Sequence, residues 1–299
     1  MIVRVWGCRG SLASPGPSTV RYGGNTSSVS ISLDDGTTLA LDAGSGIRDL
    51  GNWLGKRPAG PVHVLLTHLH LDHLQGLAFF APLWADDVEL HVWGPPSATH
   101  RLDERVATYL SPPLFPIHLS DVPSNLLFHD VPTEPFSIGS ATVTAQAVSH
   151  QGPTVGYRID HQGRSFAYLP DHEPSLGVDL TSFDVSWLSG FDLADGVDVL
   201  FHDAQYSDEE YPDHVGWGHS SISHVVTIGR RANVVQLVLF HHDPAHSDDD
   251  LELLLARACE LWGDAPNPPV LAYEGMELVL GSSESLAGTV IDDDRRTSA

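Results

Sequence analysis

Residues Leu65–Gly76, LLTHLHLDHLQG, place three histidines and an aspartate within six positions: His68, His70, Asp72 and His73. Chance is one explanation, because the chain contains 18 histidines in 299 residues. A metal site is the other, since imidazole and carboxylate together suit zinc, with manganese and iron as alternatives. So dense an H-x-H-x-D-H pattern is uncommon by chance even in a histidine-rich chain, and it favours the metal site.

The segment in front of this cluster sets its geometry. The run VHVLL, residues 62–66, is typical of a strand buried on both faces. Residues two apart point the same way in an extended chain, so His68 and His70 can share one metal. On a helix they would point about 200° apart, which predicts a strand end or loop here. Asp72 and His73 then turn away as a helix begins, and can serve a second metal.

A second metal needs further ligands, and these are expected where other apolar runs end. His150 closes ATVTAQAVSH, Asp171 follows RSFAYLP, and His241 and His242 follow VVQLVLF. A lone histidine after a strand is more often an ordinary surface or capping residue. Four such positions in a chain that also contains the H-x-H-x-D-H cluster favour metal ligands instead.

The composition excludes several classes of protein. The apolar fraction of 41% suffices for a sizeable core, and the longest apolar runs are far shorter than a membrane span. The start, MIVRVWGCRG, lacks the features of a secretion signal, and Cys8 and Cys259 form no disulfide framework, so we expect a cytoplasmic protein. The net charge of −24 disfavours a long nucleic-acid footprint, although a biased genome composition or a saline habitat would also explain the acidity.

Apolar runs of strand length alternate with turn signals along the whole chain. Helices are expected over 97–110 and 220–232, between runs such as VELHVWGP and VVQLVLF. This pattern predicts one domain, residues 1–282, made of two similar halves with sheet against sheet and helices outside. Residues 283–299 are expected to be a polar C-terminal tail.

The order H-x-H-x-D-H, a later His, an Asp and a last His resembles that of the metallo-β-lactamase superfamily, over about residues 2–282. This resemblance implies an α/β protein with a four-layer αββα sandwich and a dinuclear site at one edge. It implies that one metal is held by His68, His70 and His150. The other would be held by Asp72, His73 and His241, with Asp171 as the bridge.

Two details of the resemblance concern single positions. His241 is preferred as the last ligand because it directly follows the strand, and His242 is the alternative. The redox di-iron branch of the superfamily usually has Glu at the second motif position. This chain has His70 there, which favours a hydrolytic site with two divalent ions of the zinc type.

Two further motifs resemble those of the ribonuclease Z-like branch. VLFHDAQY (Val199–Tyr206) and VGWGHSS (Val215–Ser221) are similar to its H-E-A and G-H-S motifs. In that branch the histidine lies at the scissile phosphate and the acidic residue orients it, which implies these roles for His219 and Asp203. Asp203 replaces the usual Glu and is shorter by one methylene. A plain turn before a helix is the alternative for His219.

The expected reaction follows from the metals and from this histidine. Two metals lower the pKa of a bound water, which can then attack phosphorus or a carbonyl carbon as hydroxide. A leaving alkoxide also needs an acid, so we expect His219, Asp203 and Asp72 to be catalytic. The best-fitting function is a phosphodiesterase for a small phosphodiester, a class that includes cyclic ones. The alternatives are an acyl hydrolase for a lactone, thioester or β-lactam, and a ribonuclease Z-like RNase.

The remaining expectations concern partners and loops. Ribonuclease Z carries a long basic, glycine-rich arm that grips tRNA, and this chain shows no such insertion, so extended nucleic acid is not expected as a partner. Family members are often dimers, which makes a homodimer an open alternative. Arg9 and Asn25 could contact a phosphate or order the site, and His172 and His202 could support the ligands. The segment 111–123 could be a lid, a subunit contact or a surface loop.

Overall fold

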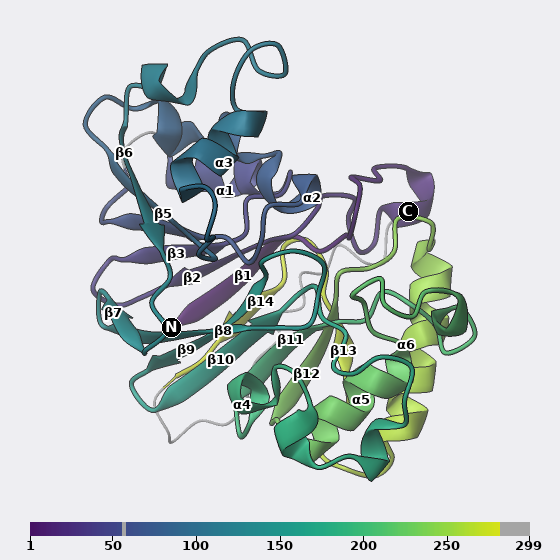
Figure 1. Cartoon of the computed structure of the whole chain (residues 1–299). Coiled ribbons are helices and arrows are strands. Elements are labelled where there is room, and N and C mark those ends of the chain that lie inside the picture. The colour runs from purple at the N-terminus through teal and green to yellow at the C-terminus, as the bar shows by residue number, and fades with distance from the viewer. Residues whose placement is uncertain (56–57, 282–299) are drawn as a thin grey trace.

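The computed structural model describes residues 1–55 and 58–281, and the predicted tail lies outside them. Within these residues two seven-stranded sheets face each other (Figure 1). The first has the order β14-β1-β2-β3-β4-β5-β6. Its strands are β1 (Ile2–Gly7), β2 (Ser28–Ser32), β3 (Thr38–Leu41), β4 (Val62–Leu65), β5 (Glu89–Gly94), β6 (Asn125–Asp130) and β14 (Glu277–Val279).

The second sheet has the order β13-β12-β11-β10-β9-β8-β7. Its strands are β7 (Phe136–Ile138), β8 (Ala141–Ala147), β9 (Val155–His161), β10 (Arg164–Leu169), β11 (Val199–Asp203), β12 (Gln236–Phe240) and β13 (Val270–Leu271). Each sheet therefore belongs to one half of the chain, except that β14 returns to pair with β1. This pairing ties the end of the described chain to its beginning.

Helices cover the outer face of each sheet (Figure 1). The first half contributes α1 (Ile47–Leu54), α2 (Leu71–Leu74) and α3 (Leu102–Tyr109). The second half contributes α4 (Phe191–Ala194), α5 (Ile222–Arg231) and α6 (Asp248–Trp262). The predicted αββα sandwich is therefore confirmed. Strand β6 and helices α1, α4 and α6 have no counterpart among the elements predicted above.

Three apolar layers hold the sandwich together, one between the sheets and one under each set of helices. The layer between the sheets includes Tyr157, Phe166, Tyr168, Phe201 and Phe240, all fully buried. Strands β10, β11 and β12 run parallel and are buried on both faces, which explains their continuous apolar sequences. Burial of these aromatic rings is a large part of the stability of the fold.

The parallel pairing decides where the functional residues meet. Strands β3 to β6 run parallel in the first sheet, and β10 to β13 run parallel in the second. Parallel strands end at the same edge of a sheet, where open α/β sheets typically bind their ligands. The segments that follow β4, β10, β11 and β12 therefore converge at one edge of the sandwich.

The central layer predicts a stability effect. Phe166 is fully buried and its ring meets that of Phe201 at 5.1 Å between centroids. Phe166→Ala should lower the free energy of unfolding by about 3–5 kcal/mol through lost burial and a residual cavity, measured by urea denaturation. Leu253→Ala on α6, where the side chain is 70% exposed, is the control and should change it little. Equal effects would contradict the assignment of the core.

Candidate metal centre

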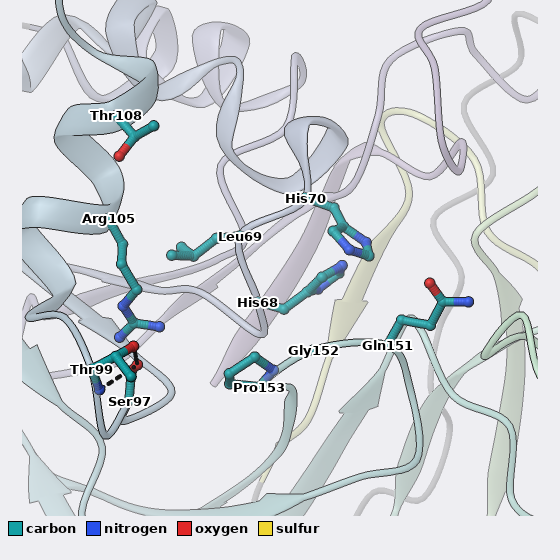
Figure 2. Close-up of a pocket in the computed structure, with 10 residues that line it drawn as sticks. All are labelled: His68, Leu69, His70, Ser97, Thr99, Arg105, Thr108, Gln151, Gly152 and Pro153. Atoms are coloured by element: carbon teal, nitrogen blue, oxygen red, sulfur yellow. Dashed lines mark hydrogen bonds between the residues drawn. The ribbon is translucent and has the colours of Figure 1, made fainter.

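A cavity of about 440 Å³ lies at the edge where the strands end (Figure 2). One wall comes from the loop between β5 and α3 and from α3 itself. The opposite wall comes from the loop after β8, residues 151–153. His68 and His70 line the cavity between these walls. Both halves of the sandwich therefore contribute to it.

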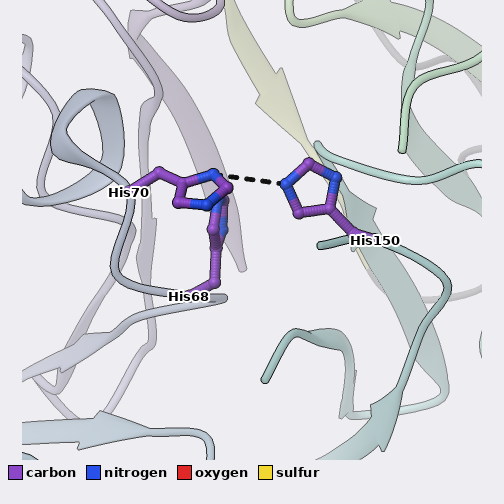
Figure 3. A group of neighbouring side chains, drawn as sticks. All are labelled: His68, His70 and His150. Carbon is purple, nitrogen blue, oxygen red and sulfur yellow. Dashed lines mark hydrogen bonds between the residues drawn. The ribbon is translucent and has the colours of Figure 1, made fainter. Parts of the chain in front are cut away.

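The first ligand group consists of His68, His70 and His150 (Figure 3). One donor nitrogen of each lies within 4.8 Å of the others, and His150 Nε2 is 3.3 Å from His70 Nδ1. His68 and His70 lie in the connection between β4 and α2, and His70 has an extended backbone as the N-cap of α2. His150 comes from the other half of the chain, at the end of the segment after β8.

The second group consists of Asp72, His73, Asp171 and His241, all buried. Asp72 and His73 lie in α2, which begins one residue after His70 as the sequence predicts. His73 Nε2 lies 2.9 Å from Asp171 Oδ1 and 3.2 Å from Asp72 Oδ2. His241 Nε2 lies 3.2 Å from the same Asp171 oxygen. These donors come from the segments that follow β4, β10 and β12.

Asp171 lies between the two groups. Its Oδ2 is 3.7 Å from both His68 Nε2 and His150 Nε2. Its Oδ1 faces His73 and His241 instead. Each oxygen of one carboxylate therefore faces one ligand group, which is the geometry that a bridging ligand requires.

Unpaired polar atoms show that these residues fit a divalent metal. His68 Nε2 is buried and makes no hydrogen bond, and His73 Nε2 and Asp171 Oδ1, which face each other at 2.9 Å, make none of good geometry. Buried polar atoms of native proteins are almost always paired, so donor atoms left in this way in one cluster need an explanation. Imidazole nitrogens and a carboxylate gathered around a common point are the donor set of a zinc-type site.

The electrostatics of the cluster favour the same conclusion. Burial lowers the pKa of His68, which leaves its Nε2 lone pair free for a metal. Burial opposes the charged form of His73 as well, but Asp171 and Asp72 outweigh it and raise its pKa. In the absence of a cation, a proton on His73 therefore balances the carboxylates. Metal binding would release that proton.

Asp42 supports two of the ligands and was not among the predicted site residues. Its Oδ2 accepts a hydrogen bond from His73 Nδ1 at 2.8 Å, and its Oδ1 accepts one from Thr67 N at 2.7 Å. Thr67 Oγ1 lies 3.1 Å from His68 Nδ1. Such contacts fix which ring nitrogen faces the metal. The available signal was its position directly after the apolar strand TLAL, the same placement that identified the ligands.

The structure distinguishes between the two candidates for the last ligand. His241 has a left-handed backbone, φ 59°, and its Nδ1 donates to Gln205 Oε1 at 3.0 Å, leaving Nε2 towards Asp171. His242 Nε2 instead lies 2.9 Å from the Ala272 carbonyl oxygen, outside both ligand groups. Strained backbone at a non-glycine residue is typical of functional sites. His241 therefore joins the cluster and His242 does not.

A buried carboxylate holds the turn that carries His219. Glu173 is fully buried and accepts hydrogen bonds from the backbone N–H groups of Gly216 and Gly218 and from the Tyr211 hydroxyl. The Gly218 carbonyl in turn accepts from His150 Nδ1 at 2.9 Å, which leaves His150 Nε2 for the metal. Glu173 was not predicted either, and the sequence PDHEP offers only its proximity to Asp171 as a signal.

His219 and Asp203 form a pair beside the ligands. His219 Nδ1 donates to Asp203 Oδ2 at 2.6 Å, so the aspartate reaches the histidine despite its shorter side chain. Asp203 is fully buried and also accepts from the backbone of Gln205 and Ser220, each at 3.0 Å. One nitrogen of His219 lies within 4.8 Å of donor atoms of His150 and Asp171. Burial lowers the pKa of His219, but Asp203 outweighs it and raises the value to about 9.

Other predicted candidates lie outside the ligand groups. Arg9 is fully buried and donates to the carbonyls of Gly23 and His246, so its role is structural rather than phosphate binding. His172 Nδ1 and His202 Nε2 lie 2.9 Å apart and contact each other.

The structure also shows the surroundings of Asn25 and of the segment 111–123, two loop regions considered in the sequence analysis. Asn25 Oδ1 accepts from Ser45 Oγ, so Asn25 orders a loop. In the segment 111–123, the ring centroid of Phe115 lies 6.4 Å from that of Phe79 and 6.5 Å from that of Trp84.

Comparisons with known proteins identify the family of the chain and several relatives. Residues 37–242 match the family model of the β-lactamase superfamily domain. A ribonuclease Z of Anoxybacillus flavithermus is 24% identical, over 79% of this chain and 87% of its own. An uncharacterised protein of Mycobacterium tuberculosis is 27% identical, over 83% of each chain. The crystal structure of Zn²⁺-bound PqqB from Methylobacterium extorquens superimposes with a TM-score of 0.67, at 19% identity over 94% of this chain and 100% of its own.

The chain belongs to the β-lactamase superfamily, and its architecture is the metallo-β-lactamase fold of a metal-dependent hydrolase. The resemblance to this superfamily and to its ribonuclease Z-like branch is confirmed. The matched segment contains both ligand groups and the His219–Asp203 pair. Among the described residues, no helix combines the length and apolar character needed to cross a membrane.

The position of Asp171 predicts the effect of its removal. Asp171→Ala should lose both metals, because one carboxylate faces both ligand groups. Metal content of the purified variant, measured by plasma mass spectrometry, checks this, and Asp192→Ala on α4 is a control at an exposed aspartate. Full occupancy of two metals in Asp171→Ala would contradict the bridging position.

Two neighbouring glycines offer a matched pair of variants. Gly218 and Gly216 both have positive φ, 90° and 85°, so alanine strains the backbone similarly at either. A Cβ at Gly218 would lie 2.2 Å from His150 Nδ1, whereas one at Gly216 would meet nothing within 4 Å. Gly218→Ala should therefore weaken metal binding, measured by chelator competition, by at least about tenfold. Gly216→Ala should not, and equal affinities would refute this role of Gly218.

Proposed function

We propose that this hydrolase is a phosphodiesterase that acts on a small phosphodiester with two divalent metals, most simply zinc. The observation that carries the proposal is the His219–Asp203 pair, held at 2.6 Å beside both ligand groups. Hydrolysis of a phosphodiester needs a proton for the leaving alkoxide, and this pair can supply it. An acyl hydrolase with the same metals would leave the pair without a task.

The chain's own residues have distinct parts in this reaction. Bound metals would lower the pKa of water in the site and stabilise charge on the phosphate oxygens. The seven donors His68, His70, Asp72, His73, His150, Asp171 and His241 would hold them. Asp203 accepts from His219 Nδ1, so the other ring nitrogen, Nε2, is the one that can protonate the leaving oxygen as its bond to phosphorus breaks. We assign to Asp72, whose Oδ2 lies 3.2 Å from His73 Nε2 and 3.3 Å from His241 Nε2, the role of accepting the proton of the attacking water.

Size and charge support a small substrate. The cavity beside His68 and His70 measures about 440 Å³, which suits a small molecule. The net charge of −24 would repel a long polyanion. The relative named ribonuclease Z supports cleavage of a phosphodiester. A cyclic nucleotide or cyclic sugar phosphate fits the size of the cavity and the charge of the chain better than RNA does.

The metal and the compartment are part of the same proposal. The donor set of imidazole and carboxylate supports zinc, as does the zinc-bound PqqB among the structural neighbours, with manganese or iron as alternatives. Cys8 and Cys259 are both free, which supports a reducing, cytoplasmic location. A homodimer formed from a single domain, residues 1–282, is the assembly to test first.

The His219→Ala variant tests the proposal. With zinc restored, its turnover of adenosine 2′,3′-cyclic phosphate, whose leaving group is an alkoxide, should fall by roughly 10²–10⁴-fold because the proton donor is lost, while its metal content stays at the wild-type level. His214→Ala is a control on the same segment, since His214 stacks on Tyr206 and is in neither ligand group.

Substrates of other classes separate the alternative functions. A lactone and a thioester are assayed in parallel with the phosphodiester. Unchanged phosphodiester turnover in His219→Ala would refute the mechanism. Turnover confined to the lactone or thioester would make the protein an acyl hydrolase.

A further inference from the structure

The cavity beside His68 and His70 contains a charged group that the proposed chemistry does not use. Arg105, on α3, is the one permanently charged side chain among the ten residues that line it. Figure 2 shows the side chain descending from the helix beside Ser97 and Thr99, on the far side of Leu69 from the two histidines. The cavity therefore joins the candidate metal-binding edge to a cation whose carboxylate partner, Asp130, lies 3.8 Å away.

The protein uses only part of the hydrogen-bonding capacity of the Arg105 guanidinium. Its Nη2 donates to the Pro95 carbonyl oxygen at 2.6 Å, and Asp130, the nearby carboxylate, is 3.8 Å away and half exposed. Its Nε is buried and makes no hydrogen bond. The side chain as a whole is only 16% exposed. A guanidinium offers five N–H groups in a planar fork that matches an oxyanion, and one group of the fork donates to Pro95 here, so part of the fork remains for a ligand.

The surrounding walls suit a small polar molecule. The hydroxyls of Ser97 and Thr99 lie 3.3 Å apart on one side, and Thr108 adds a third hydroxyl from α3. Gly152 and Pro153 form the opposite wall without contributing a charge. The chain has 39 acidic and 15 basic residues, so a partly buried cation beside the candidate metal site is unusual here. A bound anion would stabilise such a cation by pairing with it.

We propose that this cavity binds the part of the substrate that is not cleaved, and that Arg105 receives a second anionic group on that part. This inference rests on the proposed function in one respect: the phosphodiester group that is cleaved would lie at the metals. The substrate class is thereby narrowed to small phosphodiesters that carry another negative charge. Arg105 discriminates between substrates and takes no part in breaking the bond.

A binding cycle tests the second anion without requiring turnover. Adenosine 3′-monophosphate and adenosine 3′,5′-bisphosphate differ by one phosphate, and their dissociation constants for the zinc-loaded protein are measured by calorimetry. The second phosphate should tighten binding to the wild type by at least about tenfold, the effect of a hydrogen-bonded charge pair. Arg105→Gln should abolish that gain, and Arg105→Lys, which keeps the charge but loses the fork, should retain part of it.

Arg101→Gln is the matched control. Arg101 lies four residues earlier, is bound to Asp103 and does not line the cavity. It should keep the full gain from the second phosphate. Circular dichroism and metal content establish that each variant is folded and loaded. No gain in the wild type, or the same gain in Arg105→Gln, would overturn the inference.

Turnover separates this inference from the proposed function. Adenosine 2′,3′-cyclic phosphate and its 5′-phosphorylated form share one scissile diester, and the second should have the higher kcat/KM through its KM. Arg105→Gln should remove this preference with little change in kcat. If the binding cycle shows coupling but neither diester is cleaved, the proposed function fails and the anion subsite stands. If both are cleaved alike and the cycle shows no coupling, the subsite fails alone.

Discussion

The carboxylate of Asp171 is the constraint on which the site depends. It is buried among the imidazoles of His68, His73, His150 and His241, with one oxygen towards each ligand group. Burial raises the pKa of a carboxyl group, but the surrounding histidines outweigh this and hold the pKa of Asp171 well below its usual range. A negative charge at this point would allow two divalent cations to lie close together, because it would offset their mutual repulsion.

A rigid surround keeps these donors in place. Asp42 and His241 both have left-handed backbones at strand ends, and each is held there by hydrogen bonds to neighbouring segments. Glu173 holds the turn that carries His219, because its carboxylate accepts hydrogen bonds from two backbone N–H groups of that turn. The strain at these positions persists because the apolar layers on both sides of each sheet over-determine the fold. The stability of the core and the geometry of the site are therefore linked.

In the proposed mechanism the site has two regions that differ in charge, one for the chemistry and one for recognition of the substrate. The metal-binding edge gathers histidines and carboxylates from four segments, while the adjoining cavity holds Arg105 and several hydroxyls. In the proposed function, an acidic molecule with this arrangement would disfavour long polyanions through its overall field and would bind a small anion where a local cation faces it. Selectivity would then come from one arginine and from the size of the cavity, and reactivity from the metals and from His219.

The sequence by itself determined the class of fold and the residue types of the candidate ligands. The spacing of H-x-H-x-D-H fixes side-chain directions locally, and each further candidate ligand lies one to three residues after the end of a strand, a pattern readable without coordinates. Only the tertiary structure decided between His241 and His242, because neighbouring residues after a strand point to opposite sides and a left-handed backbone sets the final direction. It alone revealed Asp42, Glu173 and the cavity with Arg105, since these depend on contacts between segments far apart in the chain. Sequence spacing carries information about neighbours along the chain, whereas the packing of two sheets brings the two halves of the site together.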